Sequence, residues 1–182
     1  MEKRRVVITG LGAITPCGVN VKDFWQAMKD GKSGITKYER ISNDRQTVLI
    51  AGEIKDKDFD PTKYFDPKEA KRVERYIQFG VAASDEAIPD AGLENAGYDP
   101  YRVGVMMSSA AGGFDTFEKN HLTMLQRGYT KGSPFTIPYL IVNMAAGRVS
   151  IKHGFKGQSK AIVSACATGT HSIGDSFRAI QW

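Results

Sequence analysis

The sequence predicts an α/β fold in which helices cover a largely buried sheet. Its strand-like runs, such as residues 102–108, are continuously apolar and do not alternate, as in sheets covered on both faces. Segments with helical spacing separate these runs, which is the pattern of a layered α/β protein. The 182 residues are 41% hydrophobic, enough for one domain with a sizeable core.

The first predicted elements are a strand, a helix and a second strand. Residues 5–12 (RVVITGLG) form a β-branched run that glycines end, as expected of a short strand. Residues 21–30 have helix composition and are followed by Gly31, a common signal at a helix C-terminus. Residues 47–54 form the next strand candidate.

A solvated loop and the longest predicted helix follow. The loop, residues 55–67, is rich in Lys, Asp and Pro, which favours turns over regular structure. Residues 67–91 are expected to form the helix, because their apolar residues recur at helical spacing. These residues are Val73, Ile77, Val81 and Ile88. Pro89 removes one backbone hydrogen bond, so the helix is expected to end near Ala87 or Ile88.

The second half of the chain continues the alternation. Residues 102–108 predict a buried strand, and the small residues 109–113 allow another backbone or a ligand to approach closely. Residues 114–125 predict a helix, and residues 131–138 predict a proline-rich loop. A further helix is expected to end near Gly154. Its apolar positions are Ile141, Ala145 and Val149.

Composition excludes several classes of function. No stretch of about 18 apolar residues predicts a membrane span, and the basic start leads into a glycine-broken run unlike a signal sequence. The net charge of +5 is spread along the chain, so nucleic acid is not expected, although an acidic protein partner stays possible. Cys17 and Cys166 form neither a disulfide framework nor a metal-binding pair. We therefore expect a cytoplasmic protein without a metal.

Gly10 and Gly12 follow the first predicted strand, where a dinucleotide-binding fold carries the pattern G-x-G-x-x-G. Thr15 occupies the third glycine position. We therefore interpret these glycines as a structural turn and expect no nicotinamide cofactor.

Cys166 is the first candidate for chemistry. It follows an apolar run, and the small residues after it open a predicted helix. Backbone N–H groups and the helix dipole at such a junction favour a thiolate, and small neighbours leave the sulfur accessible to a carbonyl carbon. The backbone N–H of Cys166 is also placed to donate to an oxyanion. Position alone leaves open the alternative of a small, buried hydrophobic residue.

None of the three histidines is placed by the sequence as a base for Cys166. His171 lies roughly 140° further around the same predicted helix, so the two side chains point to different faces. His153 is expected at a helix C-terminus, where a cation is favourable, and His121 in an ordinary helix. A thiol hydrolase or redox protein needs such a base or a resolving thiol, and Cys17 is a poor candidate for the latter.

Four basic residues open the long predicted helix at spacing i, i+3, i+4 and i+7. They are Lys68, Lys71, Arg72 and Arg75. This spacing places them along one stripe that suits an acidic partner, while a solvated helix face is the alternative. Cations at a helix N-terminus oppose the helix dipole, so local stability does not explain them.

Four motifs resemble the elongating, type II β-ketoacyl-acyl-carrier-protein synthases. They are VVITGLGAITPCG near the start, IQFG at residues 77–80, IVNM at residues 141–144 and VSACATGTHSIGDSF around Cys166. The resemblance runs from residue 3 to residue 182 and is most specific around Cys166. It implies a homodimer with a thiolase-like fold, layered α-β-α-β-α, of which residues 1–182 are the N-terminal ketoacyl synthase domain, truncated relative to the family.

The resemblance also implies a chemistry, the elongation of fatty acyl chains. An acyl group on the phosphopantetheine arm of acyl carrier protein passes to Cys166. Malonyl carrier protein is then decarboxylated, and its carbanion attacks the acyl-cysteine to give a β-ketoacyl product. No cofactor of the enzyme's own is implied, because the phosphopantetheine belongs to the carrier protein.

By the same resemblance, Lys68, Lys71 and Arg72 fall where the family docks its acidic carrier protein. Ala111 falls where related enzymes often carry a bulkier residue that gates the acyl pocket. Thr136 falls where relatives commonly have an aromatic residue that reaches the pocket of the partner subunit. We expect the smaller Ala111 to admit longer or bulkier acyl chains.

Family members are much longer than this sequence. Their two active-site histidines, a lysine, a glycine-rich motif and the second oxyanion donor match no residue here. We therefore expect the chain alone to be acylated slowly at most and not to condense. The alternative is a non-catalytic ketoacyl-synthase fragment or paralogue that serves as a dimerisation or carrier-binding module, although the presence of Cys166 speaks against lost catalysis.

Overall fold

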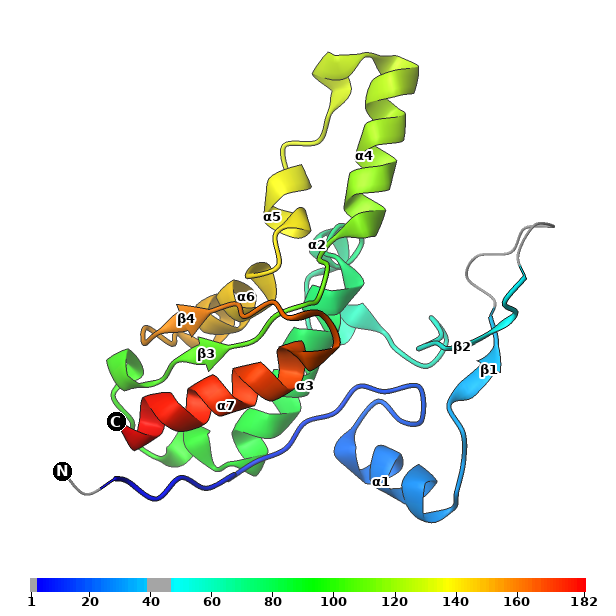
Figure 1. The fold of residues 1–182 in the computed structure, drawn as a ribbon. Helices are drawn as coiled ribbons and strands as arrows, with labels where there is room; N and C mark the ends of the chain where they lie inside the picture. The colour runs from blue at the N-terminus through cyan, green and yellow to red at the C-terminus, as the bar shows by residue number, and fades with distance from the viewer. Residues whose placement is uncertain (1–2, 39–46) are drawn as a thin grey trace.

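Helices form most of the secondary structure, and short strands lie between them (Figure 1). The computed structural model describes residues 3–38 and 47–182. The helices are α1 (Val21–Lys29), α2 (Pro67–Ala70), α3 (Arg75–Asp90), α4 (Phe114–Arg127), α5 (Thr136–Leu140), α6 (Met144–His153) and α7 (Thr168–Gln181). The strands are β1 (Ile35–Lys37), β2 (Ile50–Gly52), β3 (Val105–Met106) and β4 (Ser159–Lys160).

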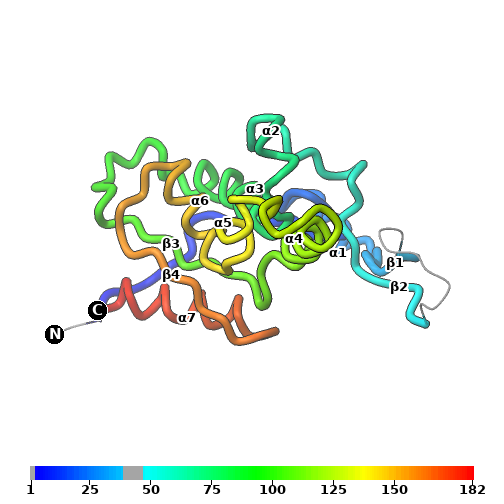
Figure 2. The backbone as a smooth tube through the Cα atoms, turned by 90° about the horizontal axis from the view of Figure 1, so that it is seen from above, coloured from blue at the N-terminus to red at the C-terminus, as the bar shows by residue number. Residues whose placement is uncertain are grey.

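Helices cover both sides of a central pair of parallel strands, β3 and β4. Helices α3 and α6 lie on one side of the pair and α7 lies on the other (Figures 1 and 2). The apolar core fills the space between α3, α6 and β3. It includes Ile77, Val81, Val105, Ala146 and Val149. This arrangement confirms the predicted layering of helices on a sheet.

The strand predicted at residues 102–108 is shorter in the structure. Arg102 belongs to a 3-10 turn, Pro100–Arg102, so regular pairing starts only at Val105. Beyond the strand, the backbone N–H of Met107 still donates to the carbonyl of Lys160 at 3.2 Å. Within the described residues, the parallel sheet therefore exists as predicted but consists of two short strands.

The strand predicted at residues 5–12 is wrong. Residues 3–14, called the N-terminal strap below, are extended but pair with no described strand. Instead, the backbone N–H of Leu11 donates to Asp90 Oδ2 at 2.8 Å, and that of Ala13 donates to Glu86 Oε2 at 3.0 Å. The strap thus bonds to carboxylates on one side of α3 and, through Arg4, to the carbonyls of Ile180 and Gln181 at the end of α7.

Gly10 and Gly12 hold the strap directly against α3. A Cβ atom on Gly10 would overlap the carbonyl oxygen of Ala87, and one on Gly12 would overlap that of Ala83. The two alanines are one helical turn apart, on the face of α3 that the strap crosses. These glycines therefore serve close packing between backbones and not a phosphate-binding turn, in agreement with their structural interpretation.

The single helix predicted at residues 67–91 is also wrong, because it is broken at residues 71–74. Helix α2 ends at Ala70, and the buried Val73 lies in the break. The side chain of Gln78, itself buried, donates to the carbonyls of Ala70 and Val73, both at 2.9 Å. These bonds satisfy carbonyls at the break.

Local end signals were more reliable for the other helices. Gly31 follows α1 with a φ of +65°, and Gly154 ends α6 with a φ of +69°. At the start of α1, Asn20 accepts from the backbone N–H of Asp23 at 2.8 Å. Helix α3 continues through Pro89 to Asp90, slightly beyond the predicted end. Helix α5 occupies part of the predicted loop 131–138, and α6 starts later than Ile141.

Two parts of the chain, the β1–β2 pair and helices α4 and α5, extend away from the central helices and sheet (Figure 1). Strands β1 and β2 pair antiparallel, so the strand predicted at residues 47–54 is confirmed at its centre. Helices α4 and α5 lie beside each other and project away from the sheet (Figure 1). Residues 114–140 are called the α4–α5 hairpin below.

Candidate active site

Cys166 lies in a tight 3-10 turn, Ala165–Ala167, that joins β4 to α7. The thiol is free and the residue is exposed, which argues against the alternative of a buried hydrophobic cysteine. Ala165 has a φ of +51°, the one positive φ of a non-glycine residue among residues 3–38 and 47–182. Such a backbone is costly and is held only by its surroundings. The result is a sharp turn that presents a thiol at the start of a helix, comparable to a nucleophile elbow.

Thr168 holds this turn in place. Its buried side-chain oxygen accepts from the backbone N–H of Ser164 at 3.0 Å. The backbone N–H of Ala167 donates to the carbonyl of Ser164 at 3.0 Å. Both bonds close the chain around Cys166 and fix the direction in which its side chain leaves the backbone.

The three histidines contact residues other than Cys166, as expected from their positions in the sequence. His171 Nδ1 lies 2.6 Å from the hydroxyl oxygen of Ser164. His153 lies at the end of α6, with Nε2 2.9 Å from Asp85 Oδ1, and His121 stacks on Phe117 within α4. In the part of the chain described here, no hydrogen bond joins a histidine to the thiol.

The segment that contains Ala111 passes close to the start of α7 (Figures 1 and 2). Ala111 is exposed between β3 and α4. Next to it, Gly112 has a φ of +85°, and a Cβ atom there would overlap the carbonyl oxygen of Leu140. The small residues 109–113 thus allow a second backbone to approach closely, which confirms that prediction.

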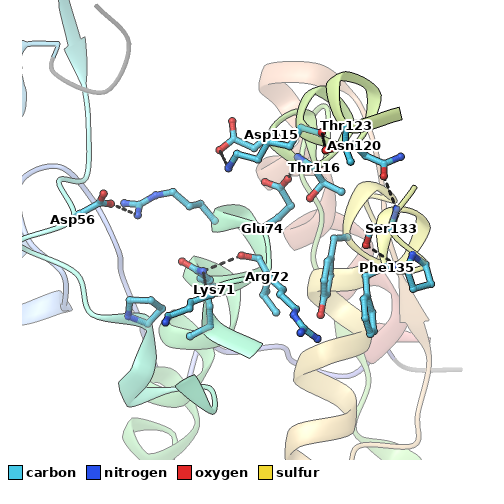
Figure 3. Close-up of a pocket in the computed structure, with 18 of the residues that line it drawn as sticks. Asp56, Lys71, Arg72, Glu74, Asp115, Thr116, Asn120, Thr123, Ser133 and Phe135 are labelled. Carbon is cyan, nitrogen blue, oxygen red and sulfur yellow. Dashed lines mark hydrogen bonds and ion pairs between the residues drawn. The ribbon is translucent and has the colours of Figure 1, made fainter. Parts of the chain in front are cut away.

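A cavity of about 800 Å³ lies between the α2–α3 break and the α4–α5 hairpin (Figure 3). Its walls combine cations, such as Lys71 and Arg72, with aromatic side chains, such as Phe135. The guanidinium of Arg72 lies 5.4 Å from the centre of the Phe135 ring, a cation–π contact. Cys166 does not line this cavity.

The four predicted basic residues do not share one helical stripe. Lys68 lies on α2, Lys71 and Arg72 lie in the break, and Arg75 begins α3. The first three are exposed. Arg75 instead donates to Asp56 Oδ1 and to the carbonyl of Ile54, both at 2.6 Å. The structure therefore leaves a three-residue basic surface, Lys68, Lys71 and Arg72, and assigns Arg75 to a structural ion pair.

Thr136 is half-buried at the start of α5 and is bonded within its own loop. Its hydroxyl donates to the carbonyl of Ser133 at 2.8 Å. Phe135, one residue earlier, supplies the aromatic ring at the cavity wall.

Sequence reasoning missed Glu74 and Gln78, which organise the break beside the basic surface. Glu74 is the one acidic residue in the basic run KRVER. This isolated acidic residue is the feature of the sequence that could have pointed to a role for Glu74. Gln78 is a polar residue at a core-facing position of a helix, which requires buried hydrogen-bond partners.

Within residues 3–38 and 47–182, no group of three or more His, Cys, Asp or Glu residues is arranged to hold a metal ion. Among the same residues, no helix combines the length and apolar character needed to cross a membrane.

Residues 3–182 match the family described as "Beta-ketoacyl synthase, N-terminal domain". The sequence is 42% identical over 181 residues to the "3-oxoacyl-[acyl-carrier-protein] synthase 2" of Synechocystis sp.. That match covers 100% of this chain and 43% of the relative. The chain therefore spans less than half the length of this curated relative.

Two solved structures are similar in fold. "The ishigamide ketosynthase/chain length factor" has a TM-score of 0.83 and 23% identity, and the match covers 98% of this chain and 44% of that one. The assembly described as "AntDE:AntF (apo): type II PKS acyl-carrier protein in complex with its ketosynthase bound to the hexaketide" has a TM-score of 0.76 and 22% identity. That match covers 99% of this chain and 47% of the other. The fold is therefore that of the N-terminal half of a ketosynthase.

Proposed function

This chain belongs to the β-ketoacyl synthase family, and from that premise we propose that it is the N-terminal part of a 3-oxoacyl-[acyl-carrier-protein] synthase of fatty acid biosynthesis. The observation that carries the proposal is the exposed thiol of Cys166 in a strained turn between β4 and α7. A nucleophile for acyl transfer needs this accessibility together with a fixed direction of approach.

Cys166 is the acyl acceptor in this proposal. Its thiolate attacks the thioester carbonyl of an acyl carrier protein, the carbonyl–sulfur bond to phosphopantetheine breaks, and the carrier leaves as a thiol after taking a proton. In the complete protein, malonyl carrier protein then loses CO₂, and its carbanion displaces Cys166 from the acyl carbon. This step forms the new carbon–carbon bond and returns the free thiol.

The condensation step is assigned to the complete protein and not to these residues. The three histidines are engaged with Ser164, Asp85 and Phe117, and none of them supports Cys166. The chain alone is proposed to accept an acyl group without condensing it. Binding of carrier protein without acylation would favour the non-catalytic carrier-binding module instead.

The basic surface of Lys68, Lys71 and Arg72 is proposed to dock the carrier protein. These side chains are exposed, and two of them line the cavity beside the α4–α5 hairpin. A similar fold is described in complex with an acyl-carrier protein. Because the carrier is acidic, the docking surface mainly raises the rate of encounter and makes it salt-dependent.

Reversing the charge of this surface is expected to separate carrier recognition from thiol reactivity. The double variant Lys71→Glu and Arg72→Glu should slow acyl transfer from an acyl carrier protein about ten-fold or more at low salt. Acylation by a small acyl thioester should stay within about two-fold, because the thiol is untouched. Mass spectrometry of acylated Cys166 over time measures both rates.

The matched control is the double variant Lys22→Glu and Lys29→Glu, which makes the same charge change on α1, at exposed positions outside the cavity. It should leave the carrier-dependent rate nearly unchanged. An equal loss in both double variants would indicate only a dependence on net charge and would remove the assigned docking surface.

Ala111 is proposed to set chain-length preference by leaving room beside the acyl group. The variant Ala111→Ile should lower the ratio of long-chain to short-chain transfer rates about ten-fold, since one or two methylene groups in a pocket discriminate to this degree. The rates are measured with short and long acyl carrier proteins. Ala110→Ile is the control, because Ala110 is also exposed in the same segment. An unchanged ratio in Ala111→Ile would refute the gating role.

We further propose that the complete protein is a cytoplasmic homodimer, with Thr136 near the partner subunit. Support comes from apolar side chains exposed on the α4–α5 hairpin, including Phe117, Leu125 and Ile137. Such surfaces are common at protein interfaces.

A further inference from the structure

The first turn of α4 takes its hydrogen-bond acceptor from another part of the chain. Helix α4 follows Gly113 and has no side-chain cap at its N-cap position. Instead, Oε1 of Glu74 accepts from the backbone N–H of Thr116, and the two residues face each other in Figure 3. A carboxylate there satisfies an unpaired N–H group and faces the positive end of the helix dipole. Glu74 stands at the N-cap position of α3 but makes no such bond to that helix.

Glu74 also packs against the base of the α4–α5 hairpin. A Cβ atom on Gly113 would come within 3.0 Å of Glu74 Cγ and would overlap the carbonyl oxygen of Tyr139. The backbone N–H of Gly113 donates to the carbonyl of Leu140 at 3.1 Å. The two ends of the hairpin therefore meet at Gly113, directly beside the Glu74 side chain.

Two neighbouring side chains complete this attachment. The hydroxyl of Tyr76 donates to the carbonyl of Ile141 at 2.6 Å, just after the hairpin ends. Burial, and then the negative charge of Glu74, raise the pKa of Tyr76 to about 12, so the hydroxyl keeps its proton in alkaline as well as neutral solution. Gln78 binds the carbonyls of Ala70 and Val73 across the break. The start of α3 is thus bonded to the break on one side and to both ends of the hairpin on the other.

We propose that Glu74 is a positioning residue that joins the exposed Lys71–Arg72 surface to the base of the α4–α5 hairpin and to the adjacent Ala111–Gly113 segment. Glu74 lies in the same break as Lys71 and Arg72, so a ligand that displaces the break also displaces the acceptor of the Thr116 amide. The link from Glu74 to α4 stands on the contacts above. Its use during carrier docking rests on the proposed function.

Amide hydrogen exchange tests the link from Glu74 to α4. In Glu74→Ala, exchange at Thr116 and its neighbours in residues 114–118 should accelerate about ten-fold, while amides in α3 and α6 stay within about two-fold. Glu74→Gln keeps an acceptor oxygen and should restore most of the protection. Glu94→Ala, a change at an exposed glutamate elsewhere, should have no effect on residues 114–118.

Two results would overturn this link. One is unchanged exchange at residues 114–118 in Glu74→Ala. The other is equal acceleration in α3, α6 and α4, which would show a general loss of stability and not a positioning role.

Acyl transfer tests the use of the link. In Glu74→Ala, transfer from an acyl carrier protein to Cys166 should fall about ten-fold, with carrier affinity and small-thioester acylation within about two-fold. Glu74→Gln should recover most of the rate. Equal loss with both thioesters, or a loss that follows carrier affinity, would refute the coupling. If the unmodified chain takes no acyl group from the carrier, the proposed function fails, whereas the exchange experiment still decides the role of Glu74 at α4.

Discussion

Replacing Cys166 with alanine is expected to abolish covalent acylation of the chain. The thiol sulfur forms the new bond to the acyl carbon, and alanine offers no nucleophile in its place. The rate with either a carrier or a small thioester should fall by at least about a thousand-fold, to the background of uncatalysed acylation. Intact-protein mass spectrometry detects the added acyl mass, and peptide mapping locates it.

Cys17 provides the matched control for this experiment. It is half-buried, with its sulfur 3.8 Å from the carbonyl oxygen of Lys32 and close to Gly34. Cys17→Ser should therefore keep the full acylation rate. Acylation that persists in Cys166→Ala but disappears in Cys17→Ser would move the nucleophile to the other thiol and reject the proposed site.

The largest effect on stability is expected at Gly12, where the N-terminal strap crosses α3. In Gly12→Ala the new methyl group overlaps the carbonyl oxygen of Ala83, and neither backbone can yield without breaking the bonds from the strap to Glu86 and Asp90. We expect a loss of about 1–3 kcal/mol in the free energy of unfolding, the usual cost of overpacking. Denaturant titration followed by circular dichroism measures it.

Gly174→Ala, within α7, serves as the comparison. A Cβ atom there meets nothing within 4 Å, and alanine is the better helix former by about 0.5–1 kcal/mol. This variant should be more stable than the unmodified chain. Equal stability of the two variants would show that the strap does not pack on α3 as closely as the structure indicates.

The sequence predicted features that depend on neighbouring residues. The helix ends at Gly31 and Gly154 and the turn at Cys166 are specified within a few residues of chain, and each lies where the sequence placed it. The layered α/β fold could also be predicted, because continuous apolar runs and helical spacing alternate along the chain.

Features that depend on distant residues could not be predicted in the same way. The run RVVITGLG has strand composition, but a strand also needs an edge to pair with, and the backbone N–H of Leu11 in this run donates to Asp90 of α3 instead. Val73 lies in the break at residues 71–74 but is still buried. Its apolar side chain therefore fits the helical spacing, and the sequence pattern does not reveal the break. Its stabilisation comes from the buried amide of Gln78, which the spacing does not reveal.

The candidate site also combines features set by neighbouring residues with features set by distant ones. Cys166 is recognisable from its local motif, whereas the cavity joins Lys71 and Arg72 to Phe135 through the packing of α3 on the hairpin. The role of Glu74 depends on a contact with Thr116, 42 residues along the chain. Such a pairing has no signature in a single sequence.

The attachment of the N-terminal strap has a consequence for the order of folding. Its bonds to α3 join residues 73 and 79 positions apart, and contacts of this separation form late because a long loop must close first. During synthesis, the strap leaves the ribosome well before Glu86 and Asp90 exist to receive it. A β-branched run thus stays without these partners through the early part of translation, and α3 can bind it only after residue 90 has been made.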